Sequence, residues 1–219
     1  MPAPEKFPVV SRRAPPRPQA DETRARIVDA ALEALRANGI AGISARTIAR
    51  HGGFNQALIF YHFGSVEGLL VAVARRESER RSALYAPALR EVTSLLELVA
   101  VARRLHDEEF AGGSVAALTQ MLAGAVGSEE LARGIWDALE PWTTLVRETI
   151  GRLLTGTPYG EALSPDDLTA AVTALFLGIE LLTGLDPTGR ERTLFTTMEV
   201  AAAGIDALLR PQAAAATDA

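Results

Sequence analysis

Few side chains in this sequence could carry out covalent or metal chemistry. The 219-residue chain has no cysteine and three histidines, so disulfide scaffolds, thiolate metal sites and cysteine nucleophiles are excluded. His106 and Glu109 are spaced to share a helix face, but a helical di-iron site needs a second Glu-x-x-His pair and further glutamates. We therefore expect no metal and no cofactor, and we interpret residues 106–109 as a solvated acidic segment.

A group of polar residues close together in the sequence is better suited to hydrogen bonding than to catalysis. Its members are Ser44, Arg46, Asn55, Gln56, Tyr61 and His62. They combine hydroxyl, guanidinium, amide and imidazole groups, which donate and accept hydrogen bonds on a surface. No nucleophile–base arrangement and no phosphate-binding glycine loop accompanies them. We therefore expect no catalytic residue, and an enzyme is the least supported of our hypotheses.

Short helices position these residues. The sequence predicts a helix over residues 22–37, a second that Ser44 caps and that ends near His51, and a third over 56–62. Gly52-Gly53 allows a sharp turn between the last two helices, and Asn55 is a good cap for the third. Two short helices joined by a glycine turn behind another helix form a helix-turn-helix unit. The expected small core of this unit is Ile43, Ile48, Ala49, Phe54, Ile59, Phe63 and Leu69.

The amino-acid pattern of residues 43–70 resembles that of the DNA-binding domain of the TetR family of repressors. The shared pattern is a hydroxyl cap, Ile-Ala, a turn of glycine and a hydrophobic residue, an aromatic-aromatic-His-Phe block, and Ser-x-Glu-x-Leu. The resemblance covers about residues 22–75 and implies an all-α protein with an N-terminal three-helix DNA-binding head and a larger C-terminal helical domain. It implies double-stranded operator DNA as a partner.

The resemblance also implies roles for the polar residues. Ser44, at a helix start, is expected to hold a phosphate. Arg46 is expected to read guanine, and Gln56 to read adenine, through their paired hydrogen bonds to base edges. Tyr61 and His62 fall where the family contacts the phosphate backbone.

Three positions depart from the family pattern. Phe60 stands where tyrosine is usual, and Val66 stands where lysine is usual, so a hydroxyl and a cation are missing from the expected phosphate contacts. Asn55 replaces a common serine but still has a side chain that caps a helix. A basic, proline-rich arm over residues 1–20 either compensates in the minor groove or remains an unbound tail. Its arginines are Arg12, Arg13 and Arg17.

The charge distribution agrees with a head and a body of different roles. Residues 1–80 carry a net charge of +4 and residues 81–219 a net charge of −9. This split favours contact of the front part with a polyanion. We expect residues 1–20 as a disordered arm, 21–68 as the DNA-binding head, 69–210 as a ligand-binding and dimerisation domain, and 211–219 as a flexible tail. Further helices are expected over 66–85, 88–109, 114–125, 129–139, 141–154, 165–183 and 190–209, with Pro87 breaking the first two.

The last two expected helices are apolar on most sides. Such a helix is buried on more than one side, and a partner subunit is the simplest cover. The family resemblance implies that residues 165–183 and 190–209 pair with their copies in a homodimer. It also implies a pocket for a small apolar effector, and the alternative is that the same residues are plain core. Our candidates for its lining are His106, Phe110, Met121, Trp136, Trp142, Phe176 and Glu180. For Glu180, contact with a ligand, an arginine across the dimer, and solvent all stay open.

These observations favour a ligand-responsive, cytoplasmic transcriptional regulator with no membrane segment, most readily a repressor released from its operator by its effector. The competing hypothesis is a helical ligand-binding or interaction protein whose DNA binding is weak or lost. Phe60, Val66 and the overall net charge of −5 favour that alternative. The effector, the operator and the regulated genes are not encoded in any recognisable pattern.

Overall fold

The computed structural model describes residues 17–111, 113–157, 159–185 and 190–209. Throughout these ranges the chain is helical and has no strand, which confirms the all-α expectation. The elements are α1 (Arg17–Asn38), the short 3-10 helix η1 (Ile40–Gly42), α2 (Ala45–Gly52), α3 (Ala57–Phe63), α4 (Val66–Glu91), α5 (Leu95–Ala111), α6 (Ser114–Ala125), α7 (Glu129–Ala138), α8 (Glu140–Leu154), α9 (Pro165–Leu185) and α10 (Arg190–Leu209). Residues 1–16 of the arm expected over 1–20, and the tail expected over 211–219, lie outside the described residues.

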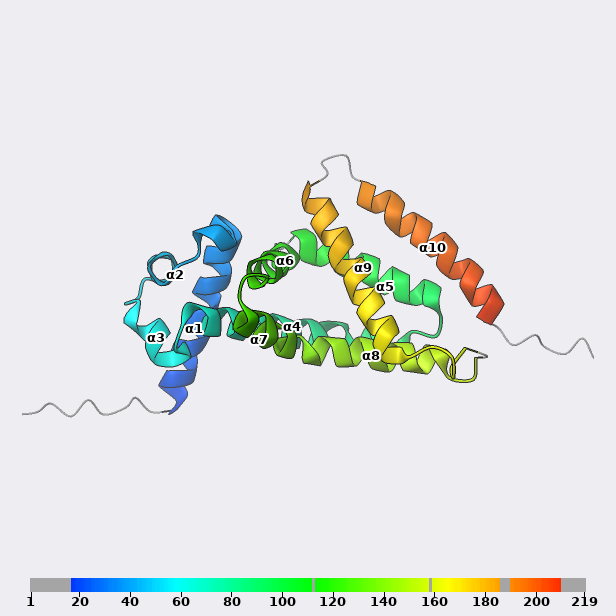
Figure 1. The fold of residues 1–219 in the computed structure, drawn as a ribbon, viewed down its shortest axis with the longest axis horizontal. Coiled ribbons are helices and arrows are strands. Elements are labelled where there is room, and N and C mark those ends of the chain that lie inside the picture. The colour runs from blue at the N-terminus through cyan, green and yellow to red at the C-terminus, as the bar shows by residue number, and fades with distance from the viewer. Residues whose placement is uncertain (1–16, 112, 158, 186–189, 210–219) are drawn as a thin grey trace, which may run out of the picture.

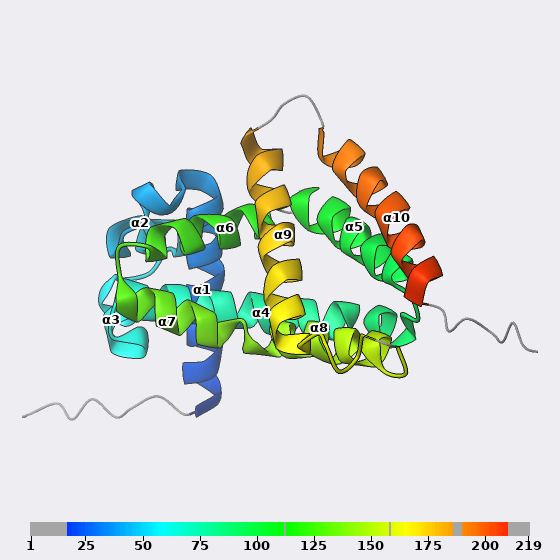
Figure 2. The same ribbon diagram turned by 45° about the vertical axis from the view of Figure 1, so that its right-hand side comes forward.

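Helices α1, α2 and α3, which we call the head, lie together at one end of the molecule in both ribbon views (Figures 1 and 2). Helix α1 begins at Arg17, earlier than expected, so the segment 17–20 that we assigned to the arm is helical. The inward stripe of α1 is fully apolar, as its spacing predicts, and consists of Ile27, Ala30, Ala31, Ala34 and Leu35.

Local hydrogen bonds set the boundaries of α2 and α3. The Thr47 N–H donates to Ser44 Oγ at 3.1 Å, which caps α2. The turn after α2 passes through Gly53 with φ 64°, a left-handed conformation that glycine adopts cheaply. The Ala57 N–H then donates to Asn55 Oδ1 at 2.9 Å. The cap expected at Ser44 is therefore confirmed. The cap expected at Asn55 is not, because Gln56 occupies the N-cap position of α3 and Asn55 lies one residue earlier.

The head shares its core with the helices behind it. Ile48 of α2 and Ile59 of α3 have no exposed surface, and they belong to one apolar cluster with Met121 of α6 and Ile135 of α7. The expected head-core residues Ile43, Phe54 and Phe63 pack against this cluster while partly buried. The continuous core holds the head against the rest of the chain, which we call the body (α4–α10).

Helix α4 runs through Pro87, so the break that we expected at this residue is wrong. Tyr85 and Leu89 on either side of Pro87 are 1% and 2% exposed, and they pack in one cluster with Leu145 and Ile150 of α8. Proline inside a helix costs about 3 kcal/mol, and the burial of these large side chains offsets that cost. The helix ends instead at Glu91.

The body is built around α4 and α8, with α9 crossing over them and α10 lying along α5 (Figures 1 and 2). The carboxylate of Asp206 on α10 accepts hydrogen bonds from the Leu95 and Leu96 N–H groups at 2.8 and 2.9 Å. This contact caps the start of α5 and fastens α10 to it.

Among the described residues, no single helix is both long and apolar enough to cross a membrane. Helices α3 and α4 pass the same test only as a pair, and they are bent by 65° at the break between them.

Candidate nucleic-acid interface and internal cavity

The polar residues singled out in the head lie on its surface. The side chains of Ser44, Arg46, Asn55, Gln56 and Tyr61 are all exposed. The side-chain oxygens of Ser44, which caps α2, and of Asn55, which precedes α3, already accept backbone hydrogen bonds. The geometry leaves Gln56, just ahead of the first turn of α3, and Tyr61, 67% exposed, free to meet a partner surface.

The C-terminal end of α3 is fastened to α1 by a residue that the sequence did not single out. Arg24 Nη1 donates to the His62 carbonyl oxygen at 2.5 Å, and its guanidinium lies 4.5 Å from the centre of the Phe63 ring. Burial, with the nearby charge of Arg24, lowers the pKa of His62 below its ordinary value. His62 is half-buried and its ring meets the Tyr61 ring edge-on at 4.9 Å. In this position His62 can both pack against its neighbours and contact a partner at the surface.

The two departures from the family pattern have different structural settings. Phe60 is 51% exposed, so it presents a ring without a hydroxyl on the outer part of α3. Val66, in place of lysine, packs against the shared core. The first turn of α4 therefore uses this position for packing rather than for a positive charge.

The head matches a known family. Residues 27–73 match the family model for bacterial regulatory proteins of the tetR family. The head is therefore of the TetR-family type. The matched segment includes α2, α3 and the turn between them, which are the elements that carry the exposed polar residues.

Proteins similar to this chain are named as transcriptional regulators. It is 40% identical over 60 residues to the HTH-type transcriptional regulator SrpR of Pseudomonas putida, over 27% of this chain and 28% of SrpR. It is 26% identical over 161 residues to the HTH-type transcriptional regulator UidR of Escherichia coli K12, over 74% of this chain and 79% of UidR. The matched segments span less than half the length of SrpR and of TtgW, another Pseudomonas putida relative.

A solved structure extends the likeness into the body. The multidrug binding protein EbrR, solved in complex with imidazole, superposes with a TM-score of 0.56 and 26% identity, over 80% of this chain and 93% of EbrR. The helical body behind the head is therefore an arrangement that this solved structure shares.

The body encloses a cavity of about 280 Å³. Its lining comes from α4, α5, α6, α8, α9 and α10 and from Leu139, between α7 and α8, and it is apolar except for Arg81, Thr143 and Thr173. Trp142 and Phe176 line it, as the sequence predicts for a ligand pocket. Leu105 and Phe195 also line it, and these were missed because their helices are separated widely in the sequence.

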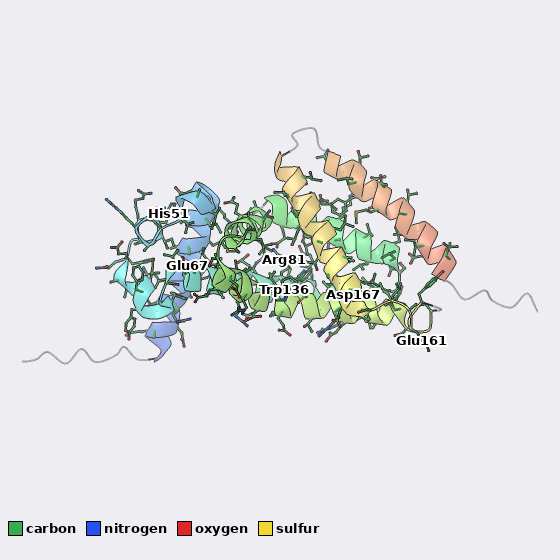
Figure 3. All side chains as sticks on the ribbon, viewed as in Figure 1. His51, Glu67, Arg81, Trp136, Glu161 and Asp167 are labelled. Carbon is green, nitrogen blue, oxygen red and sulfur yellow. The ribbon has the colours of Figure 1, made fainter. Side chains whose placement is uncertain are left out.

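Several other candidate lining residues lie elsewhere. Met121 is fully buried in the core that the head shares with α6 and α7, away from the cavity lining. Trp136 is 67% exposed, because α7 turns Leu131, Ile135 and Ala138 inward and leaves the neighbouring tryptophan outside. Figure 3 labels Trp136 beside α7. The side chain of Phe110 lies outside the described residues.

His106 and Glu180 form a buried pair behind the cavity wall. His106 Nδ1 and Glu180 Oε1 are 2.6 Å apart, and the two residues are 4% and 5% exposed. The His106 ring lies 5.2 Å from the ring of Phe195, which lines the cavity. Of the three possibilities left open for Glu180, the burial of the residue excludes solvent, and its Oε1 pairs with a histidine of α5.

The interpretation of residues 106–109 as a solvated acidic segment is wrong for two of its members. His106 is buried as described, and Glu109 is 5% exposed, whereas Asp107 and Glu108 are exposed. His106 and Glu109 are spaced to point inward together with Leu105, and this spacing was the available signal. The described residues hold no cluster of three or more metal-ligating side chains.

Glu109 is the centre of an ion-pair cluster between α4 and α5. Arg80 Nη2 lies 2.7 and 2.5 Å from its two carboxylate oxygens, and Arg81 Nη2 lies 3.2 Å from Oε2. Burial opposes ionisation of Glu109, but Arg80 and Arg81 outweigh it and hold the pKa of the carboxyl below its ordinary value. Arg80 also bonds Glu77 at 3.2 Å, and the hydrogen bond to Glu109 raises the pKa of Arg80.

Proposed function

We propose that this chain is a homodimeric transcriptional repressor that leaves its operator when a small apolar molecule fills the body cavity. The observation that carries the proposal is the exposed polar surface on α2 and α3 of a TetR-type helix-turn-helix head. In such a unit the recognition helix enters the major groove and its N-terminal residues meet base edges.

The exposed residues divide into base contacts and backbone contacts. Gln56 and Arg46 present an amide and a guanidinium that suit adenine and guanine edges. Tyr61 and Ser44 present hydroxyl groups, and His62 an imidazole, that suit phosphate oxygens. Because Phe60 and Val66 supply neither a hydroxyl nor a cation, this head has a lower affinity for the DNA phosphate backbone than the family pattern implies.

Exposed apolar side chains on the last two helices support a dimer. Their members are Leu175, Leu181 and Leu182 on α9, and Leu194, Val200, Ile205 and Leu208 on α10. A surface of this kind on adjacent helices is a typical subunit interface. Two symmetric heads then meet two half-sites one helical turn apart on the operator.

The cavity supports an effector-controlled equilibrium. Leu175 and Ile205 line the cavity while half-exposed, so the cavity reaches the surface where the partner subunit would sit. A ligand that fills it favours the dimer geometry in which it binds best. Release from DNA follows if that geometry separates the heads from successive major grooves. EbrR, a relative of comparable fold, is described as a multidrug binding protein, which supports a ligand site in this body.

The test is binding of the purified chain to the DNA upstream of its own gene, measured by fluorescence anisotropy over a salt series. Sequence-selective binding that weakens steeply with salt is expected, because phosphate contacts release counterions. Unrelated DNA of equal length is the control. Equal affinity for both DNAs at every salt concentration would contradict the proposal and favour a ligand-binding protein without operator recognition.

A further inference from the structure

A groove lies at the end of the body away from the head (Figures 1 and 2). It has a volume of about 770 Å³ and is formed by the start of α5, the end of α8, the start of α9 and the end of α10. Most of its lining is apolar, including Leu153 and Leu168, whereas Glu97, Tyr159 and Asp206 supply polar groups. Such a lining suits a ligand that has both an apolar and a polar part.

A single layer of apolar side chains separates this groove from the internal cavity. Leu95, Leu98, Val172 and Ile205 line both spaces. Ile205 is 44% exposed, and exposed side chains change rotamer within nanoseconds. A flexible chain of methylene groups can therefore pass between these residues and occupy the cavity and the groove at once.

The lining of the cavity determines the chemistry of the part that enters it. This lining is apolar almost throughout, and its charged member, Arg81, is buried and paired with Glu109. A polar ligand group placed there would lose its hydrogen bonds to water without replacing them, which is unfavourable. A cavity of about 150 Å³ holds the six carbon atoms of benzene, so one of about 280 Å³ holds an alkyl part of roughly eleven carbon atoms.

The charges of the groove determine the chemistry of the polar part. Glu97 and Asp206 line the groove, and its described lining contains no lysine, arginine or histidine. Hydrogen bonds from Thr93 hold the pKa of Glu97 below its ordinary value, against the opposing charge of Asp206. The backbone N–H groups at the start of α5 already donate to Asp206, so an anionic head would meet two carboxylates and lack those donors. A cationic head is attracted by both carboxylates and by the half-exposed ring of Tyr159.

We propose that the effector is an elongated amphiphile whose alkyl chain fills the cavity and whose cationic head, of the ammonium type, lies in the groove. The inference rests on the proposed function and deepens it by naming the chemical class of the effector. Ile205 and Leu208 of α10 line the groove and also belong to the apolar surface proposed for the dimer. The head of the ligand therefore lies beside the proposed subunit interface.

Three probes separate the contributions of the chain and of the head. Dodecyltrimethylammonium has a long chain and a cation, dodecanoate has a long chain and an anion, and pentylbenzene is a hydrocarbon small enough for the cavity alone. Their dissociation constants would be measured by calorimetric titration of the full chain below the concentrations at which the probes form micelles. Circular dichroism of the helices at the end of each titration shows that the protein is still folded.

Two pairs of variants test the passage and the charge. Val172→Trp obstructs the passage between the two spaces, and Val126→Trp is its control, because Val126 is 90% exposed and lines neither space. Glu97→Gln removes a charge from the groove but keeps an oxygen that accepts from the Thr93 N–H. Glu130→Gln is its control, because Glu130 is exposed on α7 and lines neither space.

Val172→Trp should weaken the binding of dodecyltrimethylammonium at least about tenfold, because each methylene that stays in water costs about fourfold in affinity. The same variant should change the affinity for pentylbenzene less than about threefold, since this probe does not need the passage. On the unaltered chain the cation should bind more tightly than dodecanoate. Glu97→Gln should reduce this preference by about twofold to tenfold, the range for exposed charge pairs. Neither control variant should change these quantities.

Four results would overturn the inference. They are no binding of the cation, tighter binding of dodecanoate than of the cation, a preference that Glu97→Gln leaves unchanged, and equal changes for the cation and pentylbenzene in Val172→Trp. If Val172→Trp does not fold, Ile205→Trp replaces it, because Ile205 lines the same passage and is half-exposed, and the same selective loss is expected. Operator affinity of the chain without any probe, measured separately, distinguishes failure of this inference from failure of the proposed regulator.

Discussion

Removal of Glu109 should destabilise the protein far more than removal of its partner Arg81. Glu109→Leu leaves Arg81, 3% exposed, as a buried cation without its anion, which costs about 3–5 kcal/mol. The contact itself is large, because two charges 3.2 Å apart interact by about 5 kcal/mol at an effective dielectric constant of 20. Arg80 contributes little to this cost, since its side chain is 39% exposed and can turn to solvent.

The substitution Arg81→Met, which removes the cation instead of the anion, should be nearly neutral for two structural reasons. In Arg81→Met the Glu109 carboxylate keeps both contacts with Arg80. The same change removes the buried Nε–H that has no acceptor, which returns about 1–3 kcal/mol. We therefore expect a free-energy change within about 1 kcal/mol of zero. The double variant should be more stable than Glu109→Leu alone by at least about 2 kcal/mol, because it no longer buries an unpaired cation.

The free energy of unfolding is measured by urea unfolding, followed by the circular dichroism of the helices, at one protein concentration. The four proteins compared are the unaltered chain, Glu109→Leu, Arg81→Met and the double variant. Glu129→Leu is the control, because Glu129 pairs with Arg133 at 2.6 Å with side chains 88% and 68% exposed. An exposed pair contributes about 1 kcal/mol or less. Equal losses in Glu109→Leu and Glu129→Leu, or strictly additive losses in the double variant, would refute the argument that burial of Arg81 sets the cost.

Three further predictions concern the head and the shared core. Gln56→Ala should reduce the preference for operator over unrelated DNA by about 1–3 kcal/mol, whereas Tyr61→Phe should weaken binding to both DNAs alike. Fluorescence anisotropy with the two DNAs measures these affinities. Equal losses of affinity for both DNAs in Gln56→Ala would exclude Gln56 as a residue that reads a base. The pKa of His62 is lowered in the free protein, and a phosphate beside the ring would raise it by favouring the protonated imidazole. DNA binding then takes up a proton, so DNA affinity should rise as pH falls from about 8 to about 6. His62→Gln should flatten that profile, and an identical pH slope in the variant would exclude the contact. Ile135→Ala should cost about 2–5 kcal/mol in urea unfolding, because Ile135 is fully buried, while the same loss from the exposed Trp136→Ala would contradict the assigned burial.

Helix boundaries that depend on local chemistry could be predicted well from the sequence. The helix expected over 165–183 is observed as Pro165–Leu185, and the Asp167 N–H donates to Ser164 Oγ at 3.3 Å, as a serine cap predicts. Ser128 likewise accepts from the Leu131 N–H at 3.2 Å at the start of α7. Caps and turns act within a few residues, so one sequence contains the information.

The wrong predictions for Pro87, Trp136 and Glu109 have one cause, which is that each depends on contacts between helices far apart in the sequence. Pro87 was expected to break a helix, and only the packing of Tyr85 and Leu89 against α8 shows why it does not. Trp136 and Trp142 look alike in the sequence, yet one is exposed and the other lines the cavity, because they lie on different helices. Glu109 was read as solvated because charged residues are usually exposed, and its burial depends on arginines of another helix.

The helices of the head and the Ser44 cap could be predicted from the sequence, whereas the cavity could not, for the same reason. These head elements come from one contiguous segment, so a single family pattern covers them. The cavity wall comes from six helices that meet only in the fold. Its single charged lining residue among those described, Arg81, has no distinguishing feature in a sequence where almost all basic residues are arginine.

Helix α4 is the element through which a ligand at Arg81 would act on the head. Its first turns lie in the core shared with α2 and α3, Arg76 donates to Asp29 of α1 at 2.6 Å, and Arg81 lines the cavity. The rise of a helix places Arg81 about 22 Å from the start of α4. If a ligand and the operator favour different positions of this helix, each lowers the affinity for the other by the same factor, typically about 5–150-fold. A molecule that binds the cavity equally well in the free chain and in its DNA complex is therefore a ligand of the cavity but not an effector.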